Sequence, residues 1–335
     1  MNKKLRIVIV GCGYFGQKRI QACIHLKNKL QIVAIIDTNK KRAQEVGNSL
    51  HLPYKTSLSE FLKSSTADIA IIAVPNYQHA AVVCEALKHG LHVLCEKPLS
   101  ISFKEAKKIV LAAKKYKRFV KTGSNHRFFP TIQKAHDIIT RGGIGNVLCI
   151  KGNIGTNGSH TKQSWFWDKK LSGGGTYIDN ACHLLDITRW FMGNFSSCTG
   201  MIGNTYWKKT SVEDIAGGLY KTKDGRLAII TSSWTQWTGY LSLEIWGDKG
   251  YILIDSKQGD FVIVGNKQST KKKVFDFSHK PLSSYEDELS YFVSCIQKKV
   301  EPRPNAADGA AVIHMIEGVY TSAKQKKLVQ LSQTT

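Results

Sequence analysis

The chain has 335 residues and a hydrophobic fraction of 42%, enough for two domains that each fold around an apolar core. Lysine and arginine total 48 against 25 aspartate and glutamate residues, a net charge of +23, and the excess is greatest in the first 123 residues. No nucleic-acid-binding motif or set of stacking aromatic residues accompanies this charge. We therefore expect solvated lysine-rich helix faces and no nucleic-acid partner.

The eight cysteines are scattered and contain no C-x-x-C pair, so neither a disulfide framework nor a thiolate zinc site is expected. No apolar stretch approaches the length of a membrane span. The apolar run that follows the basic start MNKK is short and is interrupted by glycine, unlike a signal peptide. The sequence predicts a protein of the reducing cytoplasm with no membrane partner.

The first functional pattern lies near the N-terminus. The predicted strand at residues 6–10 is continuously β-branched from Ile7 onward, which is typical of a strand buried on both faces of a parallel sheet. Gly11, Gly13 and Gly16 follow as G-x-G-x-x-G: the first permits a tight turn, the second lets the backbone approach a pyrophosphate, and the third lets helix and strand pack closely. A helix that opens at Tyr14 would direct its N–H groups at phosphates.

The second strand, residues 31–36, ends in Asp37, where a carboxylate can accept both ribose hydroxyls of an adenosine and repel a 2′-phosphate. The position of Asp37 at the end of the second strand predicts NAD as the cofactor, with NADP less favoured. Lys40, Lys41 and Arg42 follow closely and could weaken that preference. The alternative role for Asp37 is an ordinary helix N-cap.

Helices and strands then alternate, which is typical of a doubly wound parallel sheet. Helices are predicted at residues 40–50, 57–64, 78–89 and 102–117, and strands at residues 68–74, 92–95 and 119–123. In such sheets ligands bind beyond the carboxyl ends of the strands. The residues that follow each strand should therefore converge on one crevice.

From residue 146 the pattern changes to alternating strands separated by glycine-rich turns. These strands are predicted at residues 147–154, 198–206, 214–221, 226–235, 240–247, 250–255 and 261–265. Lys223-Asp224-Gly225 is a hairpin signal, so the sheet should be antiparallel. Four tryptophans in or beside it are expected to pack: Trp207, Trp234, Trp237 and Trp246. Helices at 285–297 and 306–324 end the chain, and the lysine run 271–273 is expected to be a solvated loop.

A second functional pattern begins with the glycine run 173–175. It precedes a predicted helix on which Asp179 and His183 are four residues apart and therefore share a face. A carboxylate and an imidazole so placed can hydrogen-bond a substrate hydroxyl and pass on its proton. A metal site is less favoured because no further ligand pattern is present, and a buried structural histidine is the other alternative.

Aromatic and basic residues adjoin one another just before this glycine run. Trp165, Phe166 and Trp167 lie among Lys162, Lys169 and Lys170. An aromatic platform with cations suits a sugar or a base joined to phosphates. Packing by the tryptophans and simple solvation of the lysines is an equally good interpretation.

Taken together, these motifs resemble the Gfo/Idh/MocA oxidoreductases, a family named for glucose-fructose oxidoreductase and inositol dehydrogenase. The resemblance rests on Gly11 to Gly16, Pro75-Asn76-x-x-His79, Glu96-Lys97-Pro98, and the run Gly173-Gly174-Gly175 followed by Asp179 and His183. It implies an α/β protein: an N-terminal Rossmann domain and a C-terminal α/β domain with a large open, mainly antiparallel sheet. It also implies metal-free hydride transfer between nicotinamide and a sugar or polyol.

We therefore expect a dinucleotide-binding domain at residues 1–123 and a substrate and oligomerisation domain at residues 124–335. The last helix, about residues 306–324, is expected to pack back toward the first domain. In the family that the chain resembles, the broad apolar sheet face packs against another subunit, so a homodimer or homotetramer is expected.

The resemblance and the strand ends together define a set of predicted site residues. Catalysis is assigned to Lys97, Asp179 and His183, and either Lys97 or His183 could be the immediate base. Cofactor binding is assigned to Gly11, Gly13, Tyr14, Phe15, Gly16, Asp37, Val74, Pro75, Asn76, His79, Glu96, Lys97 and Asn125. Substrate binding is assigned to Lys97, Asn125, Arg127, Trp165, Trp167, Asp179 and His183. For Arg127, an inter-domain packing loop is an equally good alternative.

The predicted activity is that of an NAD-dependent sugar dehydrogenase or ketoreductase that interconverts a ring hydroxyl and a ketone, possibly on a nucleotide sugar. One alternative is an inositol or polyol dehydrogenase. Another is a non-catalytic, dinucleotide-binding regulatory protein. The joint presence of Lys97, Asp179 and His183 argues against the regulatory protein, because a sensor needs no proton relay.

Overall fold

The computed structural model describes residues 4–159, 164–208 and 210–331. The chain divides into two units. Unit 1 comprises the residues up to Asn125 together with Ser283–Ala310, and unit 2 comprises His126–Leu282 together with the residues from Ala311 onward.

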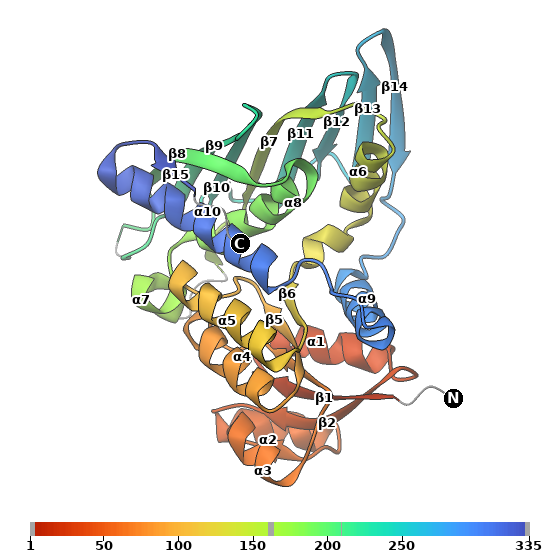
Figure 1. Cartoon of the computed structure of the whole chain (residues 1–335), viewed down its shortest axis with the longest axis vertical. Coiled ribbons are helices and arrows are strands. Elements are labelled where there is room, and N and C mark those ends of the chain that lie inside the picture. The colour runs from red at the N-terminus through yellow and green to blue at the C-terminus, as the bar shows by residue number, and fades with distance from the viewer. Residues whose placement is uncertain (1–3, 160–163, 209, 332–335) are drawn as a thin grey trace. The chain divides into compact units, whose positions relative to one another are not determined.

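The core of unit 1 is a six-stranded parallel sheet (Figure 1). Its strands are β1 (Leu5–Val10), β2 (Leu30–Ile36), β3 (Tyr54–Lys55), β4 (Ile69–Ile72), β5 (His92–Glu96) and β6 (Val120–Gly123), in the order β3-β2-β1-β4-β5-β6. Ile7, Val8 and Ile9 of β1 are fully buried. A strand buried on both faces needs apolar residues at every position, and the β-branched run meets that need. The predicted doubly wound sheet is confirmed.

The helices of this sheet begin and end close to the predicted residues. They are α1 (Tyr14–His25), α2 (Lys40–Ser49), α3 (Leu58–Ser64), α4 (His79–Lys88) and α5 (Phe103–Tyr116), with a short 3₁₀ turn, η1 (Asn76–Gln78). Ser57 and Ser102 cap α3 and α5 by accepting hydrogen bonds from main-chain N–H groups of the first turn. Strand β4 ends at Ile72, two residues before the predicted end, so Val74 lies in the turn that follows it.

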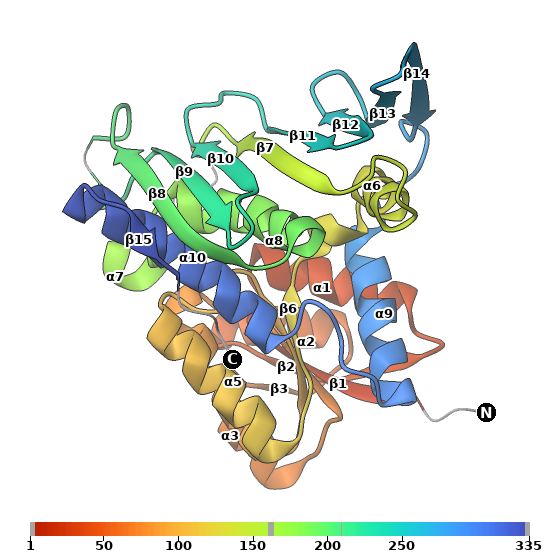
Figure 2. The same cartoon turned by 45° about the horizontal axis from the view of Figure 1, so that its top comes forward.

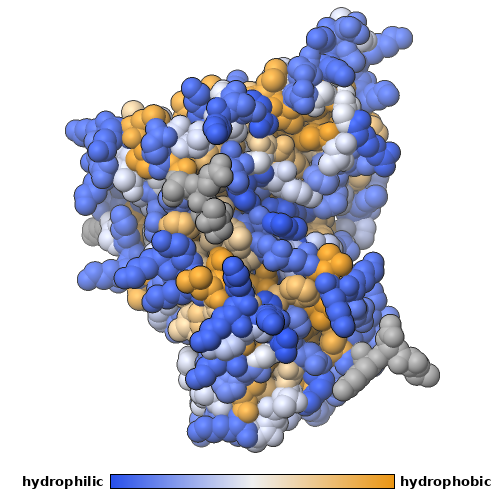
Figure 3. Space-filling model, viewed as in Figure 1, coloured by the Kyte–Doolittle hydropathy of each residue, from blue (hydrophilic) through white to orange (hydrophobic). Residues whose placement is uncertain are grey.

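The lysine-rich helix α5 bears out the solvated-face interpretation of the charge. Ala106 and Ile109 are buried against unit 1, whereas the lysines of this helix are exposed. Hydrophilic side chains likewise cover much of the molecular surface seen in Figure 3. The excess charge on α5 therefore follows from an ordinary amphipathic helix.

Helix α9 (Ser284–Lys298) belongs to unit 1, although the sequence interpretation assigned all residues from 124 onward to a second domain. Its apolar residues Leu289, Phe292 and Val293 enter the same hydrophobic core as Ile20 of α1. An amphipathic helix must cover its apolar face, and α1 supplies the cover. The boundary also falls after Asn125 and not after residue 123.

A buried network of charges joins α1, β5, β6 and α9 within unit 1. The Arg19 guanidinium donates from Nε to Glu96 Oε1 (2.6 Å) and from an Nη atom to Glu288 Oε2 (2.8 Å). The Lys121 ammonium donates to Glu288 Oε1 (2.7 Å), which also accepts the Ser124 main-chain N–H. Burial favours the protonated acid, but Lys121 and Arg19 outweigh it and hold the pKa of Glu288 below its usual range.

Unit 2 is built on a nine-stranded sheet. Its strands are β7 (Val147–Gly155), β8 (Phe195–Gly203), β9 (Ile215–Thr222), β10 (Leu227–Ser233), β11 (Tyr240–Gly247), β12 (Gly250–Asp255), β13 (Phe261–Asn266), β14 (Ser269–Asp276) and β15 (Val329–Gln330). Their order is β14-β13-β12-β11-β7-β10-β9-β8-β15. Only the β7–β10 pair among these described strands is parallel, so the predicted mainly antiparallel sheet is confirmed.

The lysine run 271–273 lies in the edge strand β14, so its prediction as a loop is wrong. Nearly every residue of β14 is exposed, and its sequence shows no alternation of apolar and polar residues. Periodicity therefore could not reveal this strand. Lysines on an edge strand oppose pairing with a strand of another chain.

Helices cover one face of the nine-stranded sheet (Figure 2). They are α6 (Pro130–Thr140), which the sequence analysis did not predict, α8 (Cys182–Met192), the π-helical turn η5 (Tyr177–Ala181) and α10 (Ala306–Gln325). Val319 of α10 lies against Gly200 and Gly218 of the sheet. Residues Ala306–Ala310 of α10 group with unit 1, and the packing of this helix toward the first domain stays a prediction. No helix in the described part of the chain combines the length and apolarity needed to cross a membrane.

The opposite face of the sheet, here termed the open face, presents apolar side chains at alternate positions. They are Ile215, Leu219, Leu227, Ile229 and Trp246, each 38–43% exposed. Ile229 pairs with Leu219 across β10 and β9, and Leu227 lies two residues from Ile229 on the same strand. Alternation with a period of two places these residues on one side, away from the buried side chains of the same strands.

We expect Glu288→Gln to lower the free energy of unfolding by about 3 kcal/mol or more, because Arg19 and Lys121 would lose a buried counter-ion. Urea unfolding at pH 7 measures this loss. Since the folded-state pKa of Glu288 is lowered, the wild-type advantage should begin to decline as the pH falls below about 4.3, the unfolded value, and should be lost as the pH falls through the lower folded-state pKa. The matched control is Glu286→Gln, whose partner His25 is exposed and whose loss should cost less than about 1 kcal/mol. Equal losses in the two variants would contradict the network's role.

Candidate active site

The three glycines of the first motif meet different constraints. Gly11 has a φ of +92°, and a Cβ atom there would lie 2.5 Å from the Ala73 carbonyl oxygen. A Cβ atom at Gly16 would collide with the Gly11 carbonyl, so helix α1 could not pack on β1. At Gly13 a Cβ atom would meet no described atom within 4 Å, so a ligand can approach the backbone there. These three observations fit the roles predicted for a dinucleotide-binding turn.

Helix α1 starts beside this open space. Gly13 is its N-cap, and no side chain among the described residues caps it, so the first-turn N–H groups can donate to an anion. Tyr14 is mostly exposed at the first position, and the Phe15 ring packs edge-on against it. A pyrophosphate fits this donor set, because its charge is opposite to the helix dipole.

Asp37 is buried at the end of β2, with both carboxylate oxygens in hydrogen bonds. Oδ2 accepts the Cys12 main-chain N–H (2.8 Å), and Oδ1 accepts the Asn39 main-chain N–H (2.9 Å). The Arg42 guanidinium donates to both oxygens at 2.8 Å. Although burial opposes ionisation, Arg42 and the two amides hold the pKa of Asp37 below its usual range. Asn39, and not Asp37, is the N-cap of α2, which removes the alternative role for Asp37.

His79 connects the turns that follow β4 and β5. Its Nδ1 atom lies 2.7 Å from the Pro98 carbonyl oxygen, and its Nε2 atom lies 2.9 Å from the Val74 carbonyl oxygen. The ring is 1% exposed, and burial lowers the pKa of His79. His79 therefore contacts main chain and acts as a positioning residue for Pro75, Asn76 and the Lys97–Pro98 turn. Direct contact of His79 with the cofactor stays a prediction.

Glu96 anchors the turn from which Lys97 projects. Its Oε1 atom accepts from Arg19, and its Oε2 atom accepts the Lys97 main-chain N–H (3.3 Å). The Lys97 ammonium lies 5.8 Å from the centroid of the Phe15 ring, beside the start of α1. Within unit 1 the structure thus brings together the glycine turn and Lys97, as the positions of the strand ends predicted.

The second glycine run is fixed by two residues that the sequence analysis missed, Glu213 and Tyr320. A Cβ atom at Gly174 would collide with the Tyr320 hydroxyl, and one at Gly175 would collide with the Glu213 carbonyl oxygen. The Glu213 carboxylate accepts the N–H groups of Gly175 (2.9 Å) and Tyr177 (3.0 Å) and the Tyr320 hydroxyl (2.8 Å). Burial raises the pKa of Glu213. No sequence motif contains Glu213 or Tyr320, because both come from distant segments.

Asp179 lies in a π-helical turn, η5, and His183 lies in the first turn of the α-helix that follows. This differs from the continuous α-helix that the sequence predicted. Asp179 Oδ2 accepts the indole N–H of Trp234 (3.3 Å), a residue predicted only to pack. The His183 ring stacks on the His126 ring, with centroids 3.7 Å apart and planes 14° apart. Isolated π turns occur frequently at functional sites, since they reorient a side chain within a helix.

The predicted aromatic platform joins this segment through Trp234. The Trp167 ring centroid lies 5.2 Å from that of Trp234 and 5.3 Å from that of Trp207. Trp165 stacks on Phe166 with centroids 3.8 Å apart. Of the three lysines, Lys169 lies 5.5 Å from the Tyr320 ring centroid, and Lys162 is outside the described residues.

Asn125 and Arg127 make contacts within their own units. The Arg127 guanidinium donates to both carboxylate oxygens of Asp186 at 2.7 Å and lies 4.7 Å from the Trp190 ring centroid. The Asn125 amide donates to the Ser284 hydroxyl (3.1 Å). These contacts show Arg127 packed within unit 2, whereas its role in inter-domain packing and ligand contacts by both residues stay predictions. His126, between them, is a further residue that no motif revealed.

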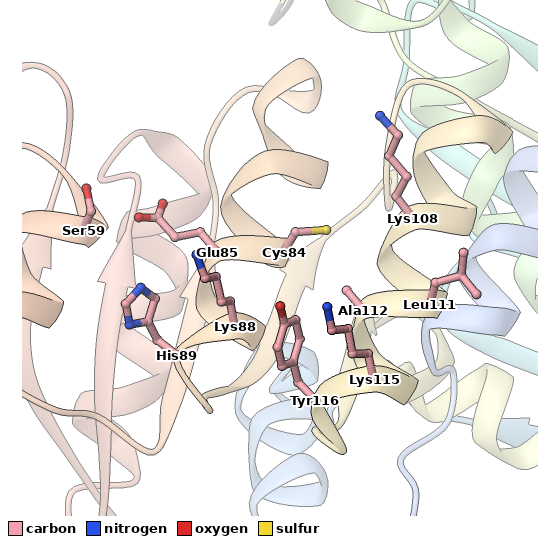
Figure 4. Close-up of a pocket in the computed structure, with 10 residues that line it drawn as sticks. All are labelled: Ser59, Cys84, Glu85, Lys88, His89, Lys108, Leu111, Ala112, Lys115 and Tyr116. Atoms are coloured by element: carbon pink, nitrogen blue, oxygen red, sulfur yellow. The ribbon is translucent and has the colours of Figure 1, made fainter.

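A surface groove between α4 and α5 contains none of the predicted site residues (Figure 4). Its lining residues are Ser59, Cys84, Glu85, Lys88, His89, Lys108, Leu111, Ala112, Lys115 and Tyr116. They come mostly from the C-terminal halves of the two helices, which lead toward the amino ends of the strands. The groove is therefore separate from the chemistry at the carboxyl ends.

Lys97 belongs to unit 1, whereas Asp179 and His183 belong to unit 2, so their joint action stays a prediction. In residues 4–159, 164–208 and 210–331, no group of three or more His, Cys, Asp or Glu side chains is arranged to hold a metal. NAD, by contrast, fits the residues present, because the open space at Gly13 and the uncapped start of α1 suit its pyrophosphate.

Comparison with known proteins identifies the family. Residues 5–124 match the model of the oxidoreductase family with an NAD-binding Rossmann fold, and residues 132–253 match that of the GFO/IDH/MocA C-terminal domain. The chain is 25% identical over 344 residues to myo-inositol 2-dehydrogenase of Thermotoga maritima, covering 98% of this chain and 99% of that protein. It is 28% identical over 259 residues to 2,7-anhydro-N-acetylneuraminate hydratase of Mediterraneibacter gnavus, covering 76% and 68% of the two chains.

Among solved structures, the fold matches levoglucosan dehydrogenase in complex with NADH and levoglucosan. The TM-score is 0.91 at 20% identity, over 99% of this chain and 100% of that chain. The two family models together span most of the sequence, and the matched ranges include the glycine turn and the glycine run described above. The chain is therefore an NAD-binding oxidoreductase that belongs to the Gfo/Idh/MocA family.

Proposed function

We propose that this protein oxidises a ring hydroxyl of an uncharged cyclic sugar or inositol, or reduces the corresponding ketone, with NAD as hydride carrier. The observation that carries the proposal is the segment from Gly175 to His183. The Gly175 N–H donates to Glu213, and the Trp234 indole N–H donates to Asp179. The His183 ring stacks on the His126 ring. A carboxylate and an imidazole held this rigidly can orient one hydroxyl group.

The names of the relatives support the ring-shaped substrate. One acts on myo-inositol, and the structural neighbour binds levoglucosan, so both take uncharged rings that carry several hydroxyls. Asp179 and His183 can each exchange hydrogen bonds with such a hydroxyl. Because another relative takes an N-acetylneuraminate derivative, an anionic sugar is the second candidate.

In the proposed reaction each residue has one task. NAD, when bound, would supply the acceptor for the hydride that leaves the carbon. The amides at the start of α1 hold its pyrophosphate, and Asp37 serves its adenosine ribose. Lys97 or His183 takes the proton that leaves the hydroxyl oxygen, while Asp179 orients His183 or that hydroxyl. The proposed substrate-binding site is lined by Trp165, Trp167, Asn125 and Arg127.

The proposed enzyme is a homodimer or homotetramer whose subunits meet through the open face. Support comes from the size and regularity of that face, where five apolar side chains on three strands are about 40% exposed. Monomeric proteins seldom leave so many apolar residues adjacent to one another on a central sheet. Two-fold association of identical faces would bury them.

We propose a cytoplasmic location, because all eight cysteines are free thiols.

We expect Lys97→Ala and His183→Phe each to lower kcat by about 10²-fold or more, because each removes a proton acceptor. The dissociation constant of NAD, measured by fluorescence titration, should change little. His183→Phe preserves a flat ring for stacking on His126. The matched control is His136→Phe, since His136 also stacks on an aromatic ring, that of Trp190. Normal turnover in His183→Phe would remove His183 from the mechanism.

A substrate panel tests the ligand class. The panel contains inositols, levoglucosan, free pyranoses, nucleotide sugars and an N-acetylneuraminate derivative, and NADH absorbance is read at low and moderate salt. We expect turnover of an uncharged ring with kcat/KM independent of salt. Turnover restricted to anionic sugars, with kcat/KM falling as salt rises, would overturn the uncharged substrate and favour the anionic one.

For the open face, we expect Ile229→Lys to shift the protein toward the monomer in size-exclusion chromatography with light scattering. A charge in a buried apolar interface is unfavourable unless it is paired. Leu111→Lys is the control, because Leu111 is 67% exposed on α5 in unit 1 and does not belong to this sheet. An unchanged assembly in Ile229→Lys, or a monomeric wild type, would refute this interface.

A further inference from the structure

Asp37 is saturated with hydrogen bonds before any cofactor binds. Each of its oxygens accepts two: Oδ1 from Asn39 and Arg42, and Oδ2 from Cys12 and Arg42. A carboxylate offers about four acceptor positions in all. The two hydroxyls of an adenosine ribose therefore cannot add to this set, and at least one existing donor has to leave.

Arg42 is the donor that can leave at least cost. The N–H groups of Cys12 and Asn39 belong to the main chain of the glycine turn and of the α2 N-terminus, so their displacement would require movement of the backbone. The Arg42 side chain is 46% exposed, whereas that of Asp37 is 3% exposed. The guanidinium can rotate into water, where it remains solvated.

The position of Arg42 in its helix also favours release. Arg42 is in the first turn of α2, where the helix dipole presents positive charge and a cation is unfavourable. Among the described residues, Asp37 is the only ion-pair partner of this guanidinium, so nothing in the helix itself holds it there. Lys41, one position earlier, is 87% exposed and points to Glu45 at 4.0 Å.

We infer that Arg42 is a displaceable counter-ion of Asp37 that competes with the adenosine ribose and sets the discrimination between NAD and NADP. When NAD binds, the ribose hydroxyls replace Arg42 on Asp37. When NADP binds, the guanidinium fork remains available to pair with the 2′-phosphate, and it offsets the repulsion from Asp37. Preference for NAD is then weaker than an isolated Asp37 would give.

Cofactor binding in the absence of sugar tests this inference. Dissociation constants for NAD and NADP are measured by calorimetry for wild type, Arg42→Leu, Asp37→Ala, the double variant and Lys41→Leu. In Arg42→Leu we expect NAD to bind as tightly as in wild type or more tightly, and NADP to bind about tenfold more weakly. The ratio of the two constants should therefore rise about tenfold. Lys41→Leu removes the same charge from the adjacent position and should change the ratio by less than about twofold.

The Asp37 variants complete the cycle. Asp37→Ala should bind NADP about tenfold more tightly than wild type, because Arg42 is released to the 2′-phosphate, and the double variant should lose that gain. Arg42→Lys keeps the charge without the fork and should give an intermediate ratio. Circular dichroism and thermal unfolding establish that each variant is folded.

Two results would overturn the inference. If the ratio in folded Arg42→Leu stays within about twofold of wild type, Arg42 takes no part in discrimination. If Arg42→Leu weakens NAD and NADP equally, Arg42 supports the shape of the Asp37 turn and does not compete with ribose. Both readouts are independent of the sugar, so they stand whether or not the proposed substrate is right.

Discussion

The network of two carboxylates and two cations inside unit 1 holds the helix that follows the glycine turn and the end of strand β5 in fixed positions. Arg19 comes from the helix that begins at the glycine turn, and Glu96 precedes Lys97 at the end of β5. Glu288 reaches the same arginine from α9. Buried charges of opposite sign tolerate little displacement, because an unpaired charge in a dry interior is very unfavourable. The proposed proton acceptor Lys97 is thus tied to the same rigid centre as the proposed phosphate-binding helix.

Local signals in the sequence predicted unit 1 well. The β-branched run of β1, the glycine spacing and the serine caps act over a few residues, so a single pass along the chain detects them. The assignment of α9 failed for the opposite reason. Its apolar face matches a surface on α1 that lies more than 260 residues earlier, as the Arg19–Glu288 pair illustrates. Strand β14 escaped detection because an exposed edge strand needs no apolar alternation.

The same contrast between local sequence signals and contacts between distant residues applies to the candidate site. Gly11, Gly13 and Gly16 were predicted with their separate roles, since backbone geometry dictates them. The sequence placed Arg42 near Asp37 but did not reveal their ion pair, and two further partners could not be foreseen: Trp234 on Asp179 and His126 on His183. Each is an ordinary residue whose importance arises only from its neighbour in space. Sequence motifs therefore name the proposed reacting groups, whereas the structure names the groups that contact them.

The parallel pairing of β7 with β10 has a consequence for how the site forms. All of the other strand pairs in this sheet run antiparallel, but between β7 and β10 the chain passes through η5, α8, β8 and β9 before it returns. The segment with Asp179 and His183 is thus part of a long crossover connection. Contacts between residues so distant in sequence form slowly, because a large loop must close first. We therefore expect the pairing of β7 with β10, and with it the placement of the segment that contains Asp179 and His183, to be late steps in folding.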